Sequence, residues 1–494
     1  MSVAREFHGL LERRPLQMLA LAGLLTAVAA RALWLKFCVL DLDVWWHLKV
    51  GDWIVEHHAV PHAGILSRTA ADRPWVAYSW GYEILLSRAY HWFGLVGMGV
   101  YGVLLTLAVA YSIFWMARRL SGRFWWACAL ATITCSAFLY NLMPRPVFLS
   151  MTLFTVTLTL ILEANHSGRV QLLYWLPPLF VLWANLHIQF LYGLFLVGLL
   201  FGVKLLQFAA DRLGIDPSFV LPSTLPLTTL AAVFAGCVVA SCIGPYSYHL
   251  YQVIYEYSKA QVPYSMIREL QPINFRAGSH YMQLLLTGAG FFALGRGKKV
   301  DLFKLALLTI ASVVAYRTMR DSWFICIPAA ACMADFPVDQ TEASRAESWL
   351  EKAGLFAIVA LSLVLVARNT DFNQRGLDRA ISSMYPVKAV NYLRQHPAPG
   401  PLYNTLDWGG FLTWYMPDYP VAIDGRNDLY GDDLDRLFFG TENGAESYAT
   451  DPYLNEAGVV LLQKSQPLAG LLLSDPRFNL VYQDQLAAIF VKRE

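Results

Sequence analysis

Long apolar runs fill most of the chain up to residue 367, and short polar segments separate them. A helix that crosses a bilayer takes about 20 apolar residues, and several of these runs approach that length. The runs lie at 15–38, 93–116, 124–140, 147–163, 172–186, 189–208, 226–243, 281–296, 302–316, 322–335 and 353–367. The pattern predicts an α-helical polytopic membrane protein with about eleven transmembrane helices.

The chain after residue 368 has a different pattern. Short apolar stretches alternate there with amphipathic helical periods, and Gly and Pro mark the joins. We expect strands at 421–423, 459–462, 480–482 and 487–491, and helices near 386–396, 407–416 and 431–439. The sequence thus predicts a transmembrane module over 1–368, with outer loops 39–92 and 244–280, and a small α/β extracytoplasmic domain over 369–494.

Composition strengthens this interpretation. Of the 494 residues, 56% are hydrophobic and 15% are charged, whereas soluble chains average about 25% charged residues. A soluble enzyme and a disordered chain are therefore excluded, and a net charge of +2 gives no reason to expect a nucleic-acid partner. Most of the seven cysteines lie inside apolar runs, so no disulfide framework is expected.

Lys and Arg are concentrated in alternate loops, which the positive-inside rule places in the cytoplasm. With the N-terminus inside, an odd number of crossings places the C-terminal domain outside the inner (cytoplasmic) membrane. One missed or added helix would reverse that side.

Acidic residues open and close the first outer loop. Asp41 and Asp43 directly follow the first apolar run and precede two tryptophans. Such carboxylates are costly at a membrane surface unless water, a cation or a substrate meets them. They are either a solvated pair at a helix start or a catalytic or metal-binding pair. Glu83 is likewise either an acid in a helical first turn or a site residue.

Polar residues at other outer helix ends form a second group. Arg145 stands between two prolines, Asn185 and His187 interrupt an apolar run, and Arg317 and Arg320 end another helix. Each alone could be an interfacial residue that reaches toward water. Together they favour a site for an anionic lipid headgroup, because the planar guanidinium binds phosphate oxygens bidentately.

The tail carries one further motif, Asp424-Gly425-Arg426. It is either a tight turn stabilised by an Asp–Arg pair or a contact for a polar acceptor such as a glycan. The tail has no nucleophile elbow, phosphate-binding glycine loop or zinc motif.

These motifs together resemble those of uncharacterised bacterial membrane proteins of the GT-C glycosyltransferase superfamily, relatives of the protein O-mannosyltransferases. The resemblance rests on Asp-x-Asp-x-Trp-Trp-His-Leu-x-x-Gly from Asp41, Trp80-x-x-Glu83, Arg145-Pro146, the segment 182–187, Asp407-Trp408-Gly409-Gly410 and Ile423-Asp424-Gly425-Arg426. It covers most of the chain.

The resemblance implies transfer of a sugar from a polyprenyl-phosphate donor to a glycan, lipid or protein acceptor on the outer membrane face. It also implies that a first-loop acid is the general base: Asp41 or Asp43, with Asp41 slightly favoured because it is nearer the helix end. Some members of the superfamily need a divalent cation, so Mg²⁺ or Mn²⁺ on this pair stays open. We expect substrate contacts from His47, Glu83, Arg145, Asn185, His187, Arg317, Arg320, Asp424 and Arg426.

The chemistry of glycosyl transfer agrees with these residue types. A base takes the proton of the acceptor hydroxyl, and a carboxylate stabilises an oxocarbenium-like transition state. The leaving phosphate needs positive charge, which the arginines could supply. The alternatives are a lipid-linked glycan flippase or transporter, a glycan polymerase or ligase, and a non-catalytic scaffold. A flippase would place its charges in mid-helix cavities and would tend to show repeated halves, neither of which is visible here.

Overall fold

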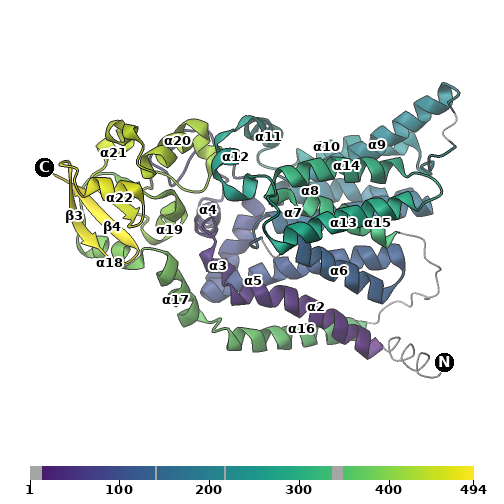
Figure 1. Cartoon of the computed structure of the whole chain (residues 1–494), viewed down its shortest axis with the longest axis horizontal. Coiled ribbons are helices and arrows are strands. Elements are labelled where there is room, and N and C mark those ends of the chain that lie inside the picture. The colour runs from purple at the N-terminus through teal and green to yellow at the C-terminus, as the bar shows by residue number, and fades with distance from the viewer. Residues whose placement is uncertain (1–13, 140–141, 216–217, 336–348, 494) are drawn as a thin grey trace. The chain divides into compact units, whose positions relative to one another are not determined.

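A computed structural model describes residues 14–139, 142–215, 218–335 and 349–493, which divide into two compact units (Figure 1). Unit 1 comprises Met1–Leu35, Gly102–Ser247 and Glu269–Thr370. Unit 2 comprises Lys36–Tyr101, Tyr248–Arg268 and Asp371–Glu494. The first outer loop, part of the second outer loop and the tail therefore belong to one compact unit.

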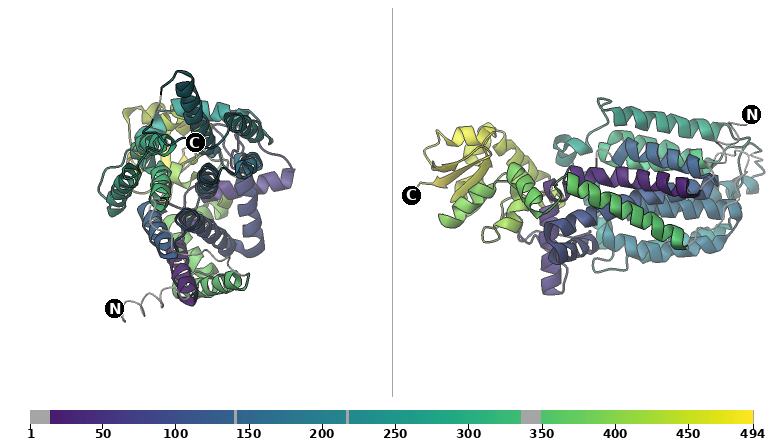
Figure 2. Two further views of the ribbon diagram at one scale, coloured as in Figure 1. Left: turned by 90° about the vertical axis from the view of Figure 1, so that its right-hand side faces the viewer. Right: turned by 90° about the horizontal axis from the view of Figure 1, so that it is seen from below.

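Unit 1 is a bundle of apolar helices. Its helices are α2 (Arg14–Trp34), the later part of α5 (Trp80–Ser121), α6 (Phe124–Phe138), α7 (Val147–Ser167), α8 (Leu176–Leu186), α9 (Phe190–Arg212), α10 (Leu227–Ser241), α13 (Gly278–Gly295), α14 (Leu302–Arg317), α15 (Trp323–Ala334) and α16 (Trp349–Asn369). Helices α2 and α16, far apart in the sequence, run side by side (Figure 2). Short 3-10 turns η2 (Val170–Trp175), η3 (Arg268–Leu270) and η4 (Met319–Asp321) join several of them.

Each of the eleven predicted apolar runs is mostly helical where the structure describes it, so the expected fold class is confirmed. Within the described ranges, five helices are long and apolar enough to cross a membrane. They are Arg14–Leu40, Trp80–Ser121, Val147–Ser167, Phe190–Arg212 and Trp349–Asn369. Crossing by the shorter helices, and the side on which each end lies, stay predictions.

Local sequence signals explain where several of these helices begin and end. Asp301 caps α14, because its carboxylate accepts a hydrogen bond from the amide of Lys304 at 3.1 Å. Gly168 ends α7 with a φ of 68°, a left-handed conformation that glycine adopts without steric cost. Gly94 (φ 61°) breaks α5, so residues 80–93 form a separate helical segment.

Unit 2 combines short helices with a four-stranded sheet. Its strands are β1 (Leu402–Asn404), β2 (Val459–Gln463), β3 (Phe478–Gln483) and β4 (Ala487–Lys492), in the order β1-β2-β4-β3. Strands β1 and β2 are parallel, and the other two pairings are antiparallel. Its helices are α3 (Phe37–Leu40), α4 (Val44–His57), α11 (His249–Lys259), α12 (Val262–Met266), α17 (Gln374–Met384), α18 (Val387–Gln395), α19 (Leu406–Tyr415), α20 (Asn427–Glu442), α21 (Pro452–Glu456) and α22 (Pro467–Leu472), with the 3-10 turn η5 (Glu446–Thr450).

The prediction of a strand at 421–423 in the tail was wrong. Three of the predicted strands form as β2, β3 and β4, but the apolar stretch 421–423 makes only an isolated bridge between Val421 and Ser67. The backbone of Val421 instead exchanges hydrogen bonds with Leu66 and Arg68 of the first outer loop. The fourth strand is β1, which at three residues is too short to produce an alternating pattern.

Candidate active site

The two acids of the first outer loop have different environments. Asp41 lies between α3 and α4 with 4% of its surface exposed, and its Oδ1 accepts a hydrogen bond from the amide of Asp43 at 3.0 Å. The hydroxyl of Tyr385 donates to the Asp41 carbonyl at 3.2 Å. Asp43 is half-buried, and its Oδ1 accepts from Nε1 of Trp46 at 3.1 Å. Asp43 is therefore the more accessible carboxylate.

Two glycines of the tail lie close to this segment of the first outer loop. A Cβ atom at Gly425 would lie 2.1 Å from Oδ1 of Asp43, and one at Gly410 would lie 2.6 Å from the carbonyl oxygen of Leu42. A side chain at Gly410 would collide with the backbone, and one at Gly425 would displace the Asp43 carboxylate. Both tail motifs therefore pack against the first-loop motif, although more than 350 residues separate them in the sequence.

His47 of α4 forms a buried pair with Glu83. Nδ1 of His47 is 3.0 Å from Oε1 of Glu83, and both side chains are almost fully buried. Oε2 of Glu83 has no hydrogen-bond partner among the described residues. The imidazole also stacks on Trp46, the residue that donates to Asp43, with ring centroids 3.5 Å apart. His47 and Glu83 thus support the Trp46 side chain that holds Asp43.

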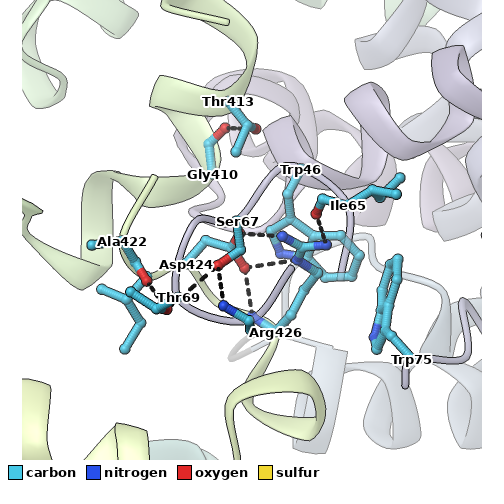
Figure 3. A network of polar contacts seen from close by, with 12 residues as sticks. Trp46, Ile65, Ser67, Thr69, Trp75, Gly410, Thr413, Ala422, Asp424 and Arg426 are labelled. Atoms are coloured by element: carbon cyan, nitrogen blue, oxygen red, sulfur yellow. Dashed lines mark hydrogen bonds and ion pairs between the residues drawn. The ribbon is translucent and has the colours of Figure 1, made fainter. Parts of the chain in front are cut away.

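The tail motif Asp424-Gly425-Arg426 is closed by its own ion pair. Nη2 of Arg426 lies 2.6 Å from Oδ2 of Asp424 and Nε lies 2.9 Å from Oδ1, with neither side chain exposed. Nη1 donates to the carbonyl of Ile65 at 2.8 Å, and the guanidinium group lies over the ring of Trp75 (Figure 3). This geometry matches a turn stabilised by an Asp–Arg pair, which was one of the two expected interpretations.

Asp428 extends this buried network. Its Oδ2 accepts a hydrogen bond from Nε1 of Trp75 at 3.0 Å. Burial raises the pKa of Asp428 to about 6, although Trp75 and Arg426 both favour the ionised form.

Unit 1 brings Arg145 and Arg320 together on one carboxylate. Nη1 of Arg145 lies 3.5 Å from Oε1 of Glu269, and Nε of Arg320 lies 3.1 Å from the same oxygen. Burial alone would raise the pKa of Glu269, but the two guanidinium groups outweigh it and lower that pKa to about 2. Glu269 is therefore an anion at all physiological pH values.

Two buried neighbours, Trp183 and Ser150, hold the neutral His187 ring in one tautomer. Nε1 of Trp183 donates to Oγ of Ser150 at 2.7 Å, and Oγ lies 2.8 Å from Nδ1 of His187. An indole can only donate, and in the described part of the chain Nδ1 is the one acceptor near the Ser150 hydroxyl. Nδ1 therefore accepts, and Nε2 carries the proton. Burial first, and then Arg320, lower the pKa of His187 to about 3, so the ring is neutral.

The remaining predicted residues have other surroundings. Nδ2 of Asn185 donates to the carbonyls of Val181 and Ile243, at 2.7 Å each, which ties α8 to the loop after α10. Arg317 is exposed in the last turn of α14 and takes no part in the contacts with Glu269. Of the three predicted arginines, the structure brings together Arg145 and Arg320.

The sequence analysis missed residues that contact the predicted site residues but belong to no motif themselves. Glu269 is an ordinary acid in the second outer loop, and Ser150 is a small polar residue within an apolar run. A hydroxyl in an apolar helix is weak evidence, because it can bond to its own backbone. The one signal in the sequence that could have identified Glu269 was its place in the same predicted outer layer as Arg145 and Arg320.

The first-loop pair offers two carboxylates as possible metal ligands. Among the described residues, no group of three or more His, Cys, Asp or Glu side chains could hold a metal ion. Oδ1 of Asp41 is engaged by a backbone amide, and Oδ1 of Asp43 by an indole. Mg²⁺ is usually held by one or two carboxylates together with water and substrate phosphates, so a cation on Asp41 and Asp43 stays a prediction.

No protein-family model matches the sequence, and no curated protein matches it. The fold is similar to ArnT from Cupriavidus metallidurans bound to undecaprenyl phosphate, at 14% identity and a TM-score of 0.47, over 94% of this chain and 97% of that one. The apo structure of the same protein gives the same values. The apo oligosaccharyltransferase from Archaeoglobus fulgidus is similar at 11% identity and a TM-score of 0.44, over 88% of this chain and 69% of that one.

Proposed function

We propose that this protein is a membrane glycosyltransferase that moves a sugar from a polyprenyl-phosphate donor to an acceptor on the outer face of the membrane. The observation that carries the proposal is the position of Asp43, a half-buried carboxylate fixed by Trp46 and by close packing of Gly425. The first-loop motif and the tail motif Asp424-Gly425-Arg426 both contribute a residue at this side chain.

In this proposal Asp43 is the general base. Its carboxylate takes the proton of the acceptor hydroxyl as the new glycosidic bond forms at the anomeric carbon. The same negative charge stabilises the oxocarbenium-like transition state. Asp41 closes the turn that sets the backbone of Asp43, because its Oδ1 accepts from that amide. Because Asp43 is the more exposed of the two acids, we favour it over Asp41, the residue that the sequence slightly favoured.

Arg145 and Arg320 bind the phosphate of the donor. The phosphate is the leaving group, so it needs positive charge rather than a general acid. Two guanidinium groups that already share one anionic oxygen supply that charge. The apolar helices of unit 1 suit a donor whose polyprenyl chain remains in lipid. No step of this mechanism requires a metal.

The test uses the purified protein in lipid nanodiscs with a panel of polyprenyl-phosphate sugars and candidate acceptors. Release of polyprenyl phosphate is followed for the wild type, Asp43→Asn and Asp41→Asn, with and without Mg²⁺ or Mn²⁺. Asp72→Asn is the matched control, because Asp72 is an exposed acid of the same loop. We expect Asp43→Asn to lower turnover by about 100-fold or more, the usual contribution of a general base.

Equal turnover in all four proteins would remove the acids from the chemistry. Loss only in Asp41→Asn would return the role of base to that residue. A lipid-linked glycan that crosses the bilayer without any release would favour the flippase instead. A dependence on the added cation would contradict the metal-free mechanism.

A further inference from the structure

Glu269 holds both arginines through a single oxygen atom. Oε1 accepts from Arg320 Nε at 3.1 Å, contacts Arg320 Nη2 closely and lies 3.5 Å from Arg145 Nη1. A guanidinium fork matches two oxygens held side by side, as carboxylates and phosphates offer them. These three contacts all use the same oxygen of the carboxylate. They neutralise charge, but in them neither guanidinium fork meets two carboxylate oxygens side by side.

The charges around this oxygen favour a larger anion. Two guanidinium groups face the Glu269 carboxylate, and the carboxyl of Asp321 is electrostatically coupled to Arg320 and Glu269. Burial raises the pKa of Asp321 and so disfavours its ionised form. His187, which is electrostatically coupled to Arg320, is neutral and adds no charge to this group. A tetrahedral phosphate presents more oxygens than a carboxylate, so it can engage both forks at once.

The backbone near Glu269 is fixed, whereas its side chain can move. The carbonyl of Gln271 accepts from the amide of Met319 at 3.0 Å, and the amide of Ile273 donates to Tyr316 at 3.2 Å. These bonds hold the segment beside η4, where Arg320 lies. The Glu269 side chain is 36% exposed, so it can rotate away from the arginines without any unfolding of the segment.

We propose that Glu269 is an internal competitor for the phosphate group of the donor: its carboxylate occupies the Arg145–Arg320 pair until a phosphate displaces it. Glu269 keeps the two like charges paired between turnovers, and after transfer it competes with the product phosphate for the same arginines. The inference rests on the proposed function only in taking the anion to be a polyprenyl phosphate.

Binding is measured on the full chain in nanodiscs with farnesyl phosphate as the probe. Farnesol tests the contribution of the prenyl chain alone, and inorganic phosphate tests the headgroup alone. Glu269→Gln keeps the size of the side chain but removes its charge. We expect it to bind farnesyl phosphate about tenfold more tightly or better, because the phosphate no longer has to displace a charged competitor from the two arginines. Farnesol affinity should not change.

Two further variants identify the cause of any gain. Glu256→Gln is the matched control, because Glu256 is an exposed acid of the preceding helix α11, and it should leave affinity unchanged. Arg320→Gln in the Glu269→Gln background should abolish the gain. A thermal melt of each variant shows whether it is folded.

Unchanged or weaker binding by a folded Glu269→Gln protein would overturn the proposal, since Glu269 would then orient the arginines rather than compete for them. An equal gain for inorganic phosphate and farnesyl phosphate would support competition and identify the phosphate itself as the ligand. These measurements need no turnover. If Glu269→Gln binds farnesyl phosphate more tightly but the wild type transfers no sugar, Glu269 is a competitor and the proposed glycosyltransferase function is rejected. If the wild type transfers sugar but Glu269→Gln does not bind more tightly, the proposed function stands and the role of Glu269 as a competitor is rejected.

Discussion

Arg426 and Asp424 stand two residues apart and form an ion pair from which solvent is fully excluded, with Nη2 and Oδ2 2.6 Å apart. The remaining Nη group of Arg426 donates to Ile65 in the first outer loop. The pair therefore does two things: it closes the turn that presents Gly425 to Asp43, and it joins the tail to the loop that carries the candidate base. Its position explains why a motif that contacts no substrate in the proposed mechanism lies so near the site.

Asp424→Asn should destabilise unit 2 strongly. The substitution leaves a buried guanidinium group without its counter-charge, and breaking a buried pair in this way costs about 3–5 kcal/mol. Thermal unfolding in detergent measures the loss. The double variant Asp424→Asn, Arg426→Met removes both charges and should recover part of it. Asp418→Asn, an exposed acid nearby, should melt with the wild type. A single variant as stable as the wild type would show that the pair is dispensable.

Gly425→Ala should impair turnover. A Cβ atom there would lie 2.1 Å from Oδ1 of Asp43, so the carboxylate must move or lose its bond from Trp46. A displacement of about 1 Å at a reacting group can cost about 100-fold in rate. The rate of polyprenyl phosphate release is the readout. Gly470→Ala is the matched control, because nothing lies within 4 Å of a Cβ atom at that position. Normal turnover in Gly425→Ala would mean that the position of Asp43 does not control the reaction.

Asp435 should make the stability of unit 2 decrease as the pH rises. Burial first, and then Asp432 and Asp428, raise its pKa from 3.8 to about 8, and both of its oxygens lack a hydrogen-bond partner among the described residues. Between about pH 4 and 8 the folded state keeps a proton that the unfolded state has lost. This contribution is complete below the unfolded pKa and is lost as the pH rises toward 8.

Asp435→Asn cannot ionise, so its melting temperature should fall less between pH 6 and 8 than that of the wild type. When the pKa values of a group in the folded and unfolded states differ by one, the free energy of unfolding changes by up to about 1.4 kcal/mol. Part of the slope should remain, because burial also raises the pKa of Glu442 to about 8. Identical slopes for the two proteins would show that Asp435 is ionised in the folded state.

The helices could be predicted from the sequence because each depends on its own residues. An apolar run such as 147–163 determines both the helix and its burial, and it forms α7. The position of Asp43 in the first-loop motif was likewise visible. Its environment was not, since Gly425 approaches it from the far end of the chain.

The partners of the candidate site depend on contacts that no local pattern records. Glu269 meets Arg145 across 124 positions and Arg320 across 51. The sequence predicts that the two arginines lie at outer helix ends, but no pattern in it identifies Glu269 as their ion-pair partner. The stretch 421–423 has the composition of a strand, and tertiary pairing with the first loop overrides that local preference.

His187 should remain neutral, with its proton on Nε2, from about pH 7 down to about pH 5, since its pKa is lowered to about 3. Nitrogen-15 NMR of labelled histidine distinguishes the two neutral tautomers and the imidazolium, and a His187→Gln protein identifies the signal.

Ser150→Ala removes the hydroxyl that donates to Nδ1, so the signal should divide between tautomers. Stability should fall by about 1–3 kcal/mol, the cost of an unpaired buried acceptor. Ser150→Thr restores a hydroxyl at the same carbon and should restore the single tautomer. An imidazolium signal in the wild type near pH 6 would contradict the assignment. So would a single Nε2–H signal in Ser150→Ala, because the proton would then be fixed by something other than the chain from Trp183 through Ser150.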